Sequence, residues 1–200
     1  MTTRDQLAQT KQYLIARRSV IQHRLVDTFR FVELGKDNGH TFSYEFASIL
    51  RDAGSAFGSV MDSLVRLASA EENKGKLGRK TKFEDYREWL TAHYVAIERL
   101  SVQVRALHPA GLVLPFSSLR EEQDPPAWWS AYNKVKHSEY KHFSRGNLEN
   151  AVLSVAALVL LERVLEVQEL QLGDAFWVNI GIVYDEAAID MSEARVLFRA

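Results

Sequence analysis

The chain has 200 residues, of which 46% are hydrophobic and 26% charged, and its formal net charge at pH 7 is −1. These proportions are those of an ordinary globular protein with one sizeable core, and a net charge near zero gives no bulk argument for nucleic acid or membrane. The absence of cysteine excludes disulfides, thiolate catalysis and cysteine-based zinc sites, and it favours a cytoplasmic location.

The sequence carries no membrane signature. Its N-terminus lacks the apolar core of a signal peptide. Its longest apolar run, 151–161, is far shorter than the roughly 20 residues that cross a bilayer. We therefore expect no membrane partner.

The first third of the chain is predicted to form two helices. Apolar residues recur at helical spacing in a segment without Pro or Gly, which predicts an amphipathic helix over about 3–32. A turn at 35–39 precedes a second helix, which Thr41 or Ser43 can cap and which continues to about residue 69.

Gly54 and Gly58 lie four residues apart on this second helix. That spacing places both on one side of the helix, where the missing side chains leave room for another helix. We interpret the pair as a site of close helix packing.

The middle of the chain contains weaker signals. Segment 71–82 reads as a solvated loop, although its five Lys and Arg residues also suit a phosphate-contacting patch. A helix is predicted over 83–96. Alternating apolar residues at 101–107 and the apolar stretch 112–114 flank a turn, which predicts a short β-hairpin.

The most informative segment is 126–140, where a proline pair opens a predicted helix. Steps of about 100° per residue divide its side chains between two faces. The face expected in the core carries Trp128, Ala131, Tyr132 and Val135. The other face carries Trp129, Asn133, Lys136, His137 and Tyr140.

This second face suits an anionic or nucleotide partner. Trp129 or Tyr140 offers a stacking plane, and Lys134 and Lys136 supply charge. His137 can exchange a proton near neutral pH. The alternative is structural: both aromatic residues cover the rim of the core, and Asn133 and His137 bond to neighbouring backbone.

The C-terminal third begins with a turn and cap at 144–147, followed by an apolar helix over 147–171 that suits the centre of a bundle. We expect a bundle over 1–172 and an extension, 173–200, that packs on it. Within the extension, 176–184 could be a strand, and 192–198 a final helical turn.

Several kinds of chemistry have no motif here. The chain lacks a Gly-rich phosphate loop, a GxSxG nucleophile elbow and an HExxH metal motif. His137 and His142 are five residues apart, a poor separation for two ligands on one helical face. We predict no metal and no cofactor.

The stretch Trp128–His137, followed by Phe143 and by Gly146–Ala151 before the apolar helix, resembles the C-terminal half of HEPN-type domains. The segment Asn38–Leu64, in which Thr41–Phe46 opens the second helix, is similar to uncharacterised bacterial proteins of the same kind, and the likeness in layout spans about 10–170. The resemblance implies a mainly α, up-and-down helical bundle, here with a short β-hairpin. It also implies a homodimer and a phage-defence or toxin–antitoxin context.

HEPN ribonucleases carry an Arg, a polar residue that is often Asn, three variable residues and a His. By this resemblance Asn133 takes the polar position and His137 that of the catalytic His. The Arg position holds Tyr132, and Lys134 and Lys136 are the nearest cations. Lysine does not reproduce the planar bidentate fork of Arg on phosphate.

We therefore predict a HEPN-like domain that binds a nucleotide, RNA or a protein partner without efficient catalysis. Its site would comprise Asn133 and His137, with Trp129, Lys134, Lys136 and Tyr140 contacting the ligand. One alternative is a metal-independent endoribonuclease that uses His137 as general base. Another is a protein-interaction bundle, such as an antitoxin-like subunit with a cognate partner.

Overall fold

The structure is a computed structural model, and it describes residues 3–71, 81–94, 97–104, 111–119, 124–171 and 195–199. Within these ranges the fold is mainly α, as predicted. Its α-helices are α1 (Thr3–Thr28), α2 (Tyr44–Glu71), α3 (Phe83–His93), α4 (Ala127–His142) and α5 (Leu148–Gln171). Short 3-10 helices are η1 (Lys36–Asn38), η2 (Ile97–Arg99) and η3 (Phe143–Arg145).

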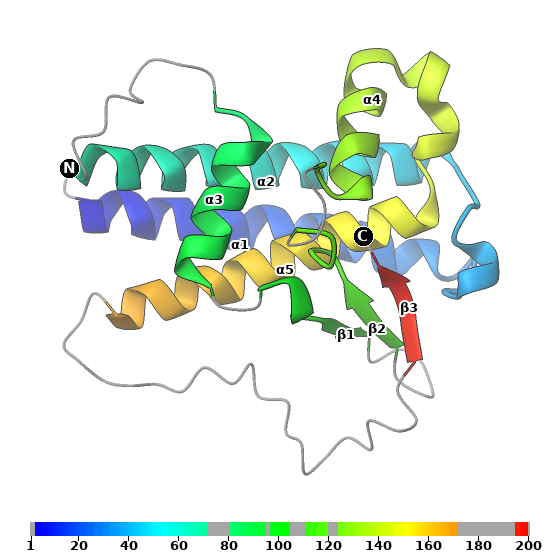
Figure 1. Ribbon diagram of the computed structural model, residues 1–200. Coiled ribbons are helices and arrows are strands. Elements are labelled where there is room, and N and C mark those ends of the chain that lie inside the picture. The colour runs from blue at the N-terminus through cyan, green and yellow to red at the C-terminus, as the bar shows by residue number, and fades with distance from the viewer. Residues whose placement is uncertain are drawn as a thin grey trace, which may run out of the picture.

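Helices α1, α2 and α5 pack lengthwise against one another, α3 crosses α2, and α4 rests on α2 and α5 (Figure 1). On α1 the buried residues Leu7, Leu14 and Ile21 recur every seven positions, which keeps one apolar seam towards the partners. Helix α5 is buried at every position from 151 to 158, as expected for the centre of a bundle. Among the described helices, none is long and apolar enough to span a membrane.

Side-chain caps fix the start of helices α2 and α5. Ser43 Oγ accepts a hydrogen bond of 3.1 Å from the Phe46 backbone N–H and caps α2. Asn147 Oδ1 accepts a bond of 3.0 Å from the Asn150 N–H and caps α5. Both predicted caps are confirmed. Of the two residues that the sequence offered for α2, Thr41 and Ser43, it is Ser43 that caps the helix.

Two helices end earlier than predicted. Turns follow Thr28, where the Phe31 N–H bonds to the Thr28 carbonyl, so α1 stops short of the predicted residue 32. Helix α3 ends at His93 with Tyr94 in extended conformation. In both places aromatic residues, which have modest helix propensity, follow the last helical residue.

The predicted hairpin is present. Strand β1 (Val102–Val104) pairs antiparallel with β2 (Gly111–Leu114). Strand β3 (Arg195–Arg199) pairs parallel with the other edge of β2, so the order is β1-β2-β3. The helical turn expected over 192–198 is therefore wrong for 195–198, because the free edge of β2 offers backbone partners to a run of β-prone residues. The ambiguous segment 176–184 lies outside the described residues.

Candidate functional site

Two glycines of α2 determine how closely α4 approaches. A Cβ on Gly54 would lie 2.4 Å from ring carbons of Tyr132, a separation that real Cβ atoms do not show. A Cβ on Gly58 would lie 3.2 Å from the ring of Trp129. The prediction of close helix packing at these glycines is thus confirmed, and the partners are the aromatic rings of α4.

The first half of α4 is part of the core. Trp128, Ala131, Tyr132 and Val135 are all buried, which confirms the predicted core face. Trp128 is fully buried, and its indole N–H donates a 2.8 Å bond to the Pro115 carbonyl. This bond gives the one polar atom of the indole a partner in the protein interior.

Trp129 lies in the core as well, with 8% of its surface exposed. Rings of α2, α3 and α4 surround it at centroid distances of 5.0 to 5.7 Å, and they belong to Phe57, Phe83, Tyr86 and Tyr132. The expected placement of Trp129 on an open face is wrong, because α3 covers the flank of α4 that a helical wheel leaves free. Its indole is therefore not available as a stacking plane.

Tyr132, which stands where HEPN ribonucleases carry an Arg, is 4% exposed. Its hydroxyl accepts a 3.0 Å hydrogen bond from Lys136 Nζ, and the same ammonium lies 5.3 Å from the Tyr132 ring centroid. Lys136 is thus directed back along the helix towards Tyr132 although it is exposed at the surface. Lys136, one of the two cations nearest to this position in sequence, is therefore already engaged.

The second half of α4 faces solvent. Lys134, His137 and Tyr140 are exposed, Tyr140 to 95%, and Asn133 is half-buried. No described residue hydrogen-bonds to the side chain of Asn133 or His137, so the backbone bonds of the structural alternative are not formed there. Ser138 has non-helical backbone angles (φ −159°, ψ 73°) and bends the helix before η3 (Figure 1).

This exposed half is strongly basic. Between 134 and 145 the chain carries four Lys or Arg residues and one acid, Glu139. Glu139 accepts a hydrogen bond from the guanidinium of Arg51 on α2, so its charge is compensated. We call the exposed cations the cationic strip: Lys134, Lys136, Lys141 and Arg145.

Sequence reasoning missed two contributions to this surface. Arg51 comes from α2, and nothing in the linear sequence connects it with Glu139. The second is a group of aromatic rings, Phe42, Tyr44 and Phe143, which meet beside the end of α4. The aromatic run before α2 was a signal for this group, but its contact with Phe143 follows from the fold alone.

Titratable groups with displaced pKa values lie in the core or on other helices. Burial, and then a 2.5 Å hydrogen bond to Asp62, raises the pKa of Tyr86, and burial raises that of Tyr94. A hydrogen bond to Glu45 raises the pKa of Arg24 despite partial desolvation. The Tyr86 bond ties α3 to α2 and the Arg24 bonds tie α1 to α2, so these groups serve the packing of the bundle.

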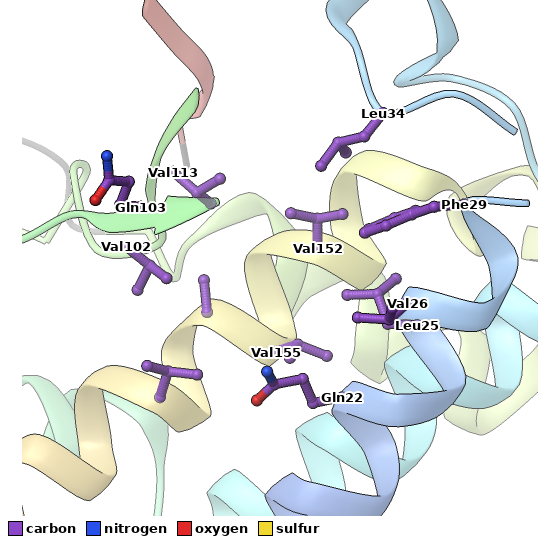
Figure 2. Close-up of a pocket in the computed structure, with 12 residues that line it drawn as sticks. Gln22, Leu25, Val26, Phe29, Leu34, Val102, Gln103, Val113, Val152 and Val155 are labelled. Atoms are coloured by element: carbon purple, nitrogen blue, oxygen red, sulfur yellow. The ribbon is translucent and has the colours of Figure 1, made fainter. Parts of the chain in front are cut away.

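A pocket of about 340 Å³ opens elsewhere on the molecule, between α1, α5 and the hairpin. Figure 2 shows apolar side chains such as Phe29, Val113 and Val155 around it, together with the amides of Gln22 and Gln103. None of the described residues that line it is ionisable, and none belongs to α4. The pocket has room for a small apolar molecule, and its described lining offers no side chain for acid–base chemistry.

Among the described residues there is no group of three or more His, Asp or Glu side chains arranged to hold a metal ion. Comparisons with protein-family models, with curated proteins and with solved structures gave no significant match.

Proposed function

We propose that this protein is a HEPN-like module that binds RNA or nucleotides through the exposed half of α4, without efficient catalysis. The cationic strip carries this proposal, because four cations along one short segment attract a chain of phosphates. A cytoplasmic role in phage defence or in a toxin–antitoxin pair is the context that the family resemblance suggests.

The side chains of the strip differ in the contacts that they can make. Lys134 and Lys141 are exposed, and as compact cations they suit phosphate oxygens. Tyr140 projects almost completely into solvent beside them and offers a ring for a base. His137 can donate or accept a hydrogen bond at a ribose hydroxyl or a base edge.

Weak catalysis follows from the missing guanidinium. Cleavage at a ribose 2′-hydroxyl needs a base and also a cation that stabilises charge on the scissile phosphate. His137 suits the first role. Tyr132 is buried against α2, Lys136 is bonded to Tyr132, and Arg51 is bonded to Glu139. Lys136 and Arg51 are thus engaged, and the exposed Lys134 lacks the planar bidentate fork of Arg.

Binding is tested by fluorescence anisotropy with a labelled single-stranded oligouridylate of about 12 nucleotides, at salt concentrations from about 50 to 200 mM. We expect affinity to fall steeply with salt. Lys141→Ala should weaken binding and reduce the slope of log K against log salt by about 0.7, the value for one lost contact with a single strand. Arg4→Ala is the matched control, because it removes an exposed cation near the opposite end of the bundle (Figure 1). Equal effects of the two variants would refute a role for the strip.

Catalysis is tested on the same RNA in EDTA, with wild type and His137→Ala. Intact RNA with both proteins supports a binding module. Cleavage by wild type alone would establish the endoribonuclease alternative. It would imply that Lys134 supplies the missing cation, or that Lys136 or Arg51 leaves its partner when RNA binds.

The family resemblance also implies a homodimer, which sedimentation equilibrium of the full chain would detect. If wild type binds no RNA at low salt, the interaction bundle with a cognate protein partner becomes the better reading. In that case assembly should persist at high salt, because apolar contacts are not screened.

A further inference from the structure

Three aromatic rings form a cluster on the surface at the end of the bundle. The ring centroid of Phe143 lies 5.4 Å from that of Phe42 in an edge-on arrangement and 4.4 Å from that of Tyr44 at an interplanar angle of 39°. Phe42 is 50% exposed and Tyr44 is 75% exposed. Isolated exposed apolar residues are common on proteins, but rings that contact one another and still face solvent indicate a binding surface. We call Phe42, Tyr44 and Phe143 the aromatic cluster.

The backbone beneath the cluster is firmly held. Phe42 forms a β-bridge with Asn147, and the Ser43 N–H donates a 3.2 Å bond to the Gly146 carbonyl. A Cβ on Gly146 would lie 2.5 Å from the Cβ of Ala47, so glycine is needed for this close approach. The rings therefore rest on a rigid base, and a ligand that stacks on them need not order the backbone first.

The cluster continues from the cationic strip along the chain. Phe143 follows the last turn of α4 directly, between Lys141 and Arg145. Of the nearby acids, Glu45 accepts a 2.9 Å bond from Arg24. A carboxylate oxygen of Glu149 lies 4.0 Å from His40 Nδ1, which would offset its charge only when that ring is protonated. The surface thus combines flat apolar rings with excess positive charge, which matches a ligand with aromatic bases and phosphates.

We propose that the aromatic cluster is a stacking platform for the bases of a single-stranded nucleic acid whose phosphates contact the cationic strip. Tyr44, the more exposed of the two rings that contact Phe143, presents its face to a base, and Phe143 supports that ring by direct contact. Stacking accepts every base, so the platform recognises single strands without reading sequence. This inference rests on the proposed function. It adds the residues by which the protein would bind a strand with bases more tightly than a sugar-phosphate chain without them.

The experiment compares two labelled probes of about 12 nucleotides, an oligothymidylate and an abasic sugar-phosphate strand of equal length. Wild type should bind the thymidylate at least about tenfold more tightly than the abasic strand, as expected for one or more stacked bases. The double variant Phe42→Leu/Tyr44→Leu keeps apolar bulk but removes both aromatic faces. It should lose this preference and retain its affinity for the abasic strand.

Two controls make the result specific. Tyr13→Leu replaces a partly exposed tyrosine on α1 and should leave the preference unchanged. If the double variant is unfolded in a thermal melt, Tyr44→Leu alone is used, since a side chain that is 75% exposed contributes little to packing.

The outcomes separate the two proposals. Equal binding of both probes by wild type overturns the platform and leaves phosphate binding by the strip intact. If Tyr140→Leu abolishes the preference for thymidylate and Phe42→Leu/Tyr44→Leu does not, the bases stack on Tyr140. That result also overturns the platform. Failure of wild type to bind either probe overturns the platform and the proposed function together.

Discussion

Both halves of α4 carry aromatic residues, but the surroundings of these residues are opposite. In the first half Trp128, Trp129 and Tyr132 lie beneath α2 and α3. In the second half Tyr140 is 95% exposed on the same helix. An aromatic residue on an amphipathic helix therefore has no fixed role, and the neighbouring elements decide whether it stabilises the fold or faces a partner. The first half should govern stability and the second half binding.

The largest expected loss of stability comes from a substitution in the buried half of α4. Trp128→Ala removes a fully buried indole that packs edge-on against Phe57 at 5.2 Å and bonds to the Pro115 carbonyl. We expect the free energy of unfolding to fall by about 3 to 5 kcal/mol. Urea denaturation followed by circular dichroism measures the change. A loss below about 1 kcal/mol, the range of ordinary substitutions, would show that α4 is not part of the core.

The next effect concerns the contact between α2 and α4. In an exposed helix Gly→Ala is favourable by about 1 kcal/mol, but Gly54→Ala forces a Cβ into the ring of Tyr132 at 2.4 Å. We expect net destabilisation of about 1 to 3 kcal/mol, measured by the same denaturation. Gly58→Ala meets Trp129 at 3.2 Å and should cost less.

Gly35→Ala is the matched control, because Gly35 has an extended backbone and nothing within 4 Å of the added Cβ. Combining Gly54→Ala with Tyr132→Ala should give a change smaller than the sum of the single changes, since the clash disappears. Additive effects would contradict direct contact between the two residues.

Alkaline pH should lower the free energy of unfolding through Tyr86 of α3, whose ring packs against Trp129 in the buried half of α4. Burial and the bond to Asp62 raise the pKa of Tyr86 above its unfolded value of about 10. The folded state therefore keeps a proton that the unfolded state releases, so this contribution to stability is complete below pH about 10 and declines above it, by up to about 1.4 kcal/mol per pH unit. Denaturation midpoints of wild type and Tyr86→Phe between pH about 8 and 11 test this. An equally steep decline in the variant would assign the effect to other groups.

The smallest effect on stability belongs to the exposed half. Tyr140→Ala and His137→Ala remove side chains that face solvent, and each should change the free energy of unfolding by less than about 0.5 kcal/mol. The same variants are expected to reduce affinity for single-stranded RNA in the anisotropy assay. A large loss of stability with unchanged binding would show that the exposed half serves the fold and not a ligand.

Local patterns predicted much of the fold. The heptad spacing of Leu7, Leu14 and Ile21 gave the first helix, and small capping side chains at Ser43 and Asn147 marked two helix starts. These features depend on residues within a few turns of one another. The strand at 195–199 was predicted less well, because its backbone partner, β2, is distant in sequence.

The candidate site was predicted only in part. A helical wheel correctly assigns Trp128 to the core face and Asn133 to the other face. It assumes, however, that every side chain outside the core face is exposed to solvent. It therefore placed Trp129 beside His137, whereas α3 buries it. The wheel describes a single helix, so it does not predict a contact between helices such as that of Arg51 with Glu139.

The sequence by itself determined the mainly helical class, the hairpin, the close packing at Gly54 and Gly58, and the concentration of cations between 134 and 145. These depend on periodicity, residue size and charge, which are properties of short segments. The tertiary structure alone decided the burial of Trp129 and the meeting of Phe42 and Tyr44 with Phe143. Such contacts join residues on different elements, distant in the sequence, and their geometry exists only once the helices have packed.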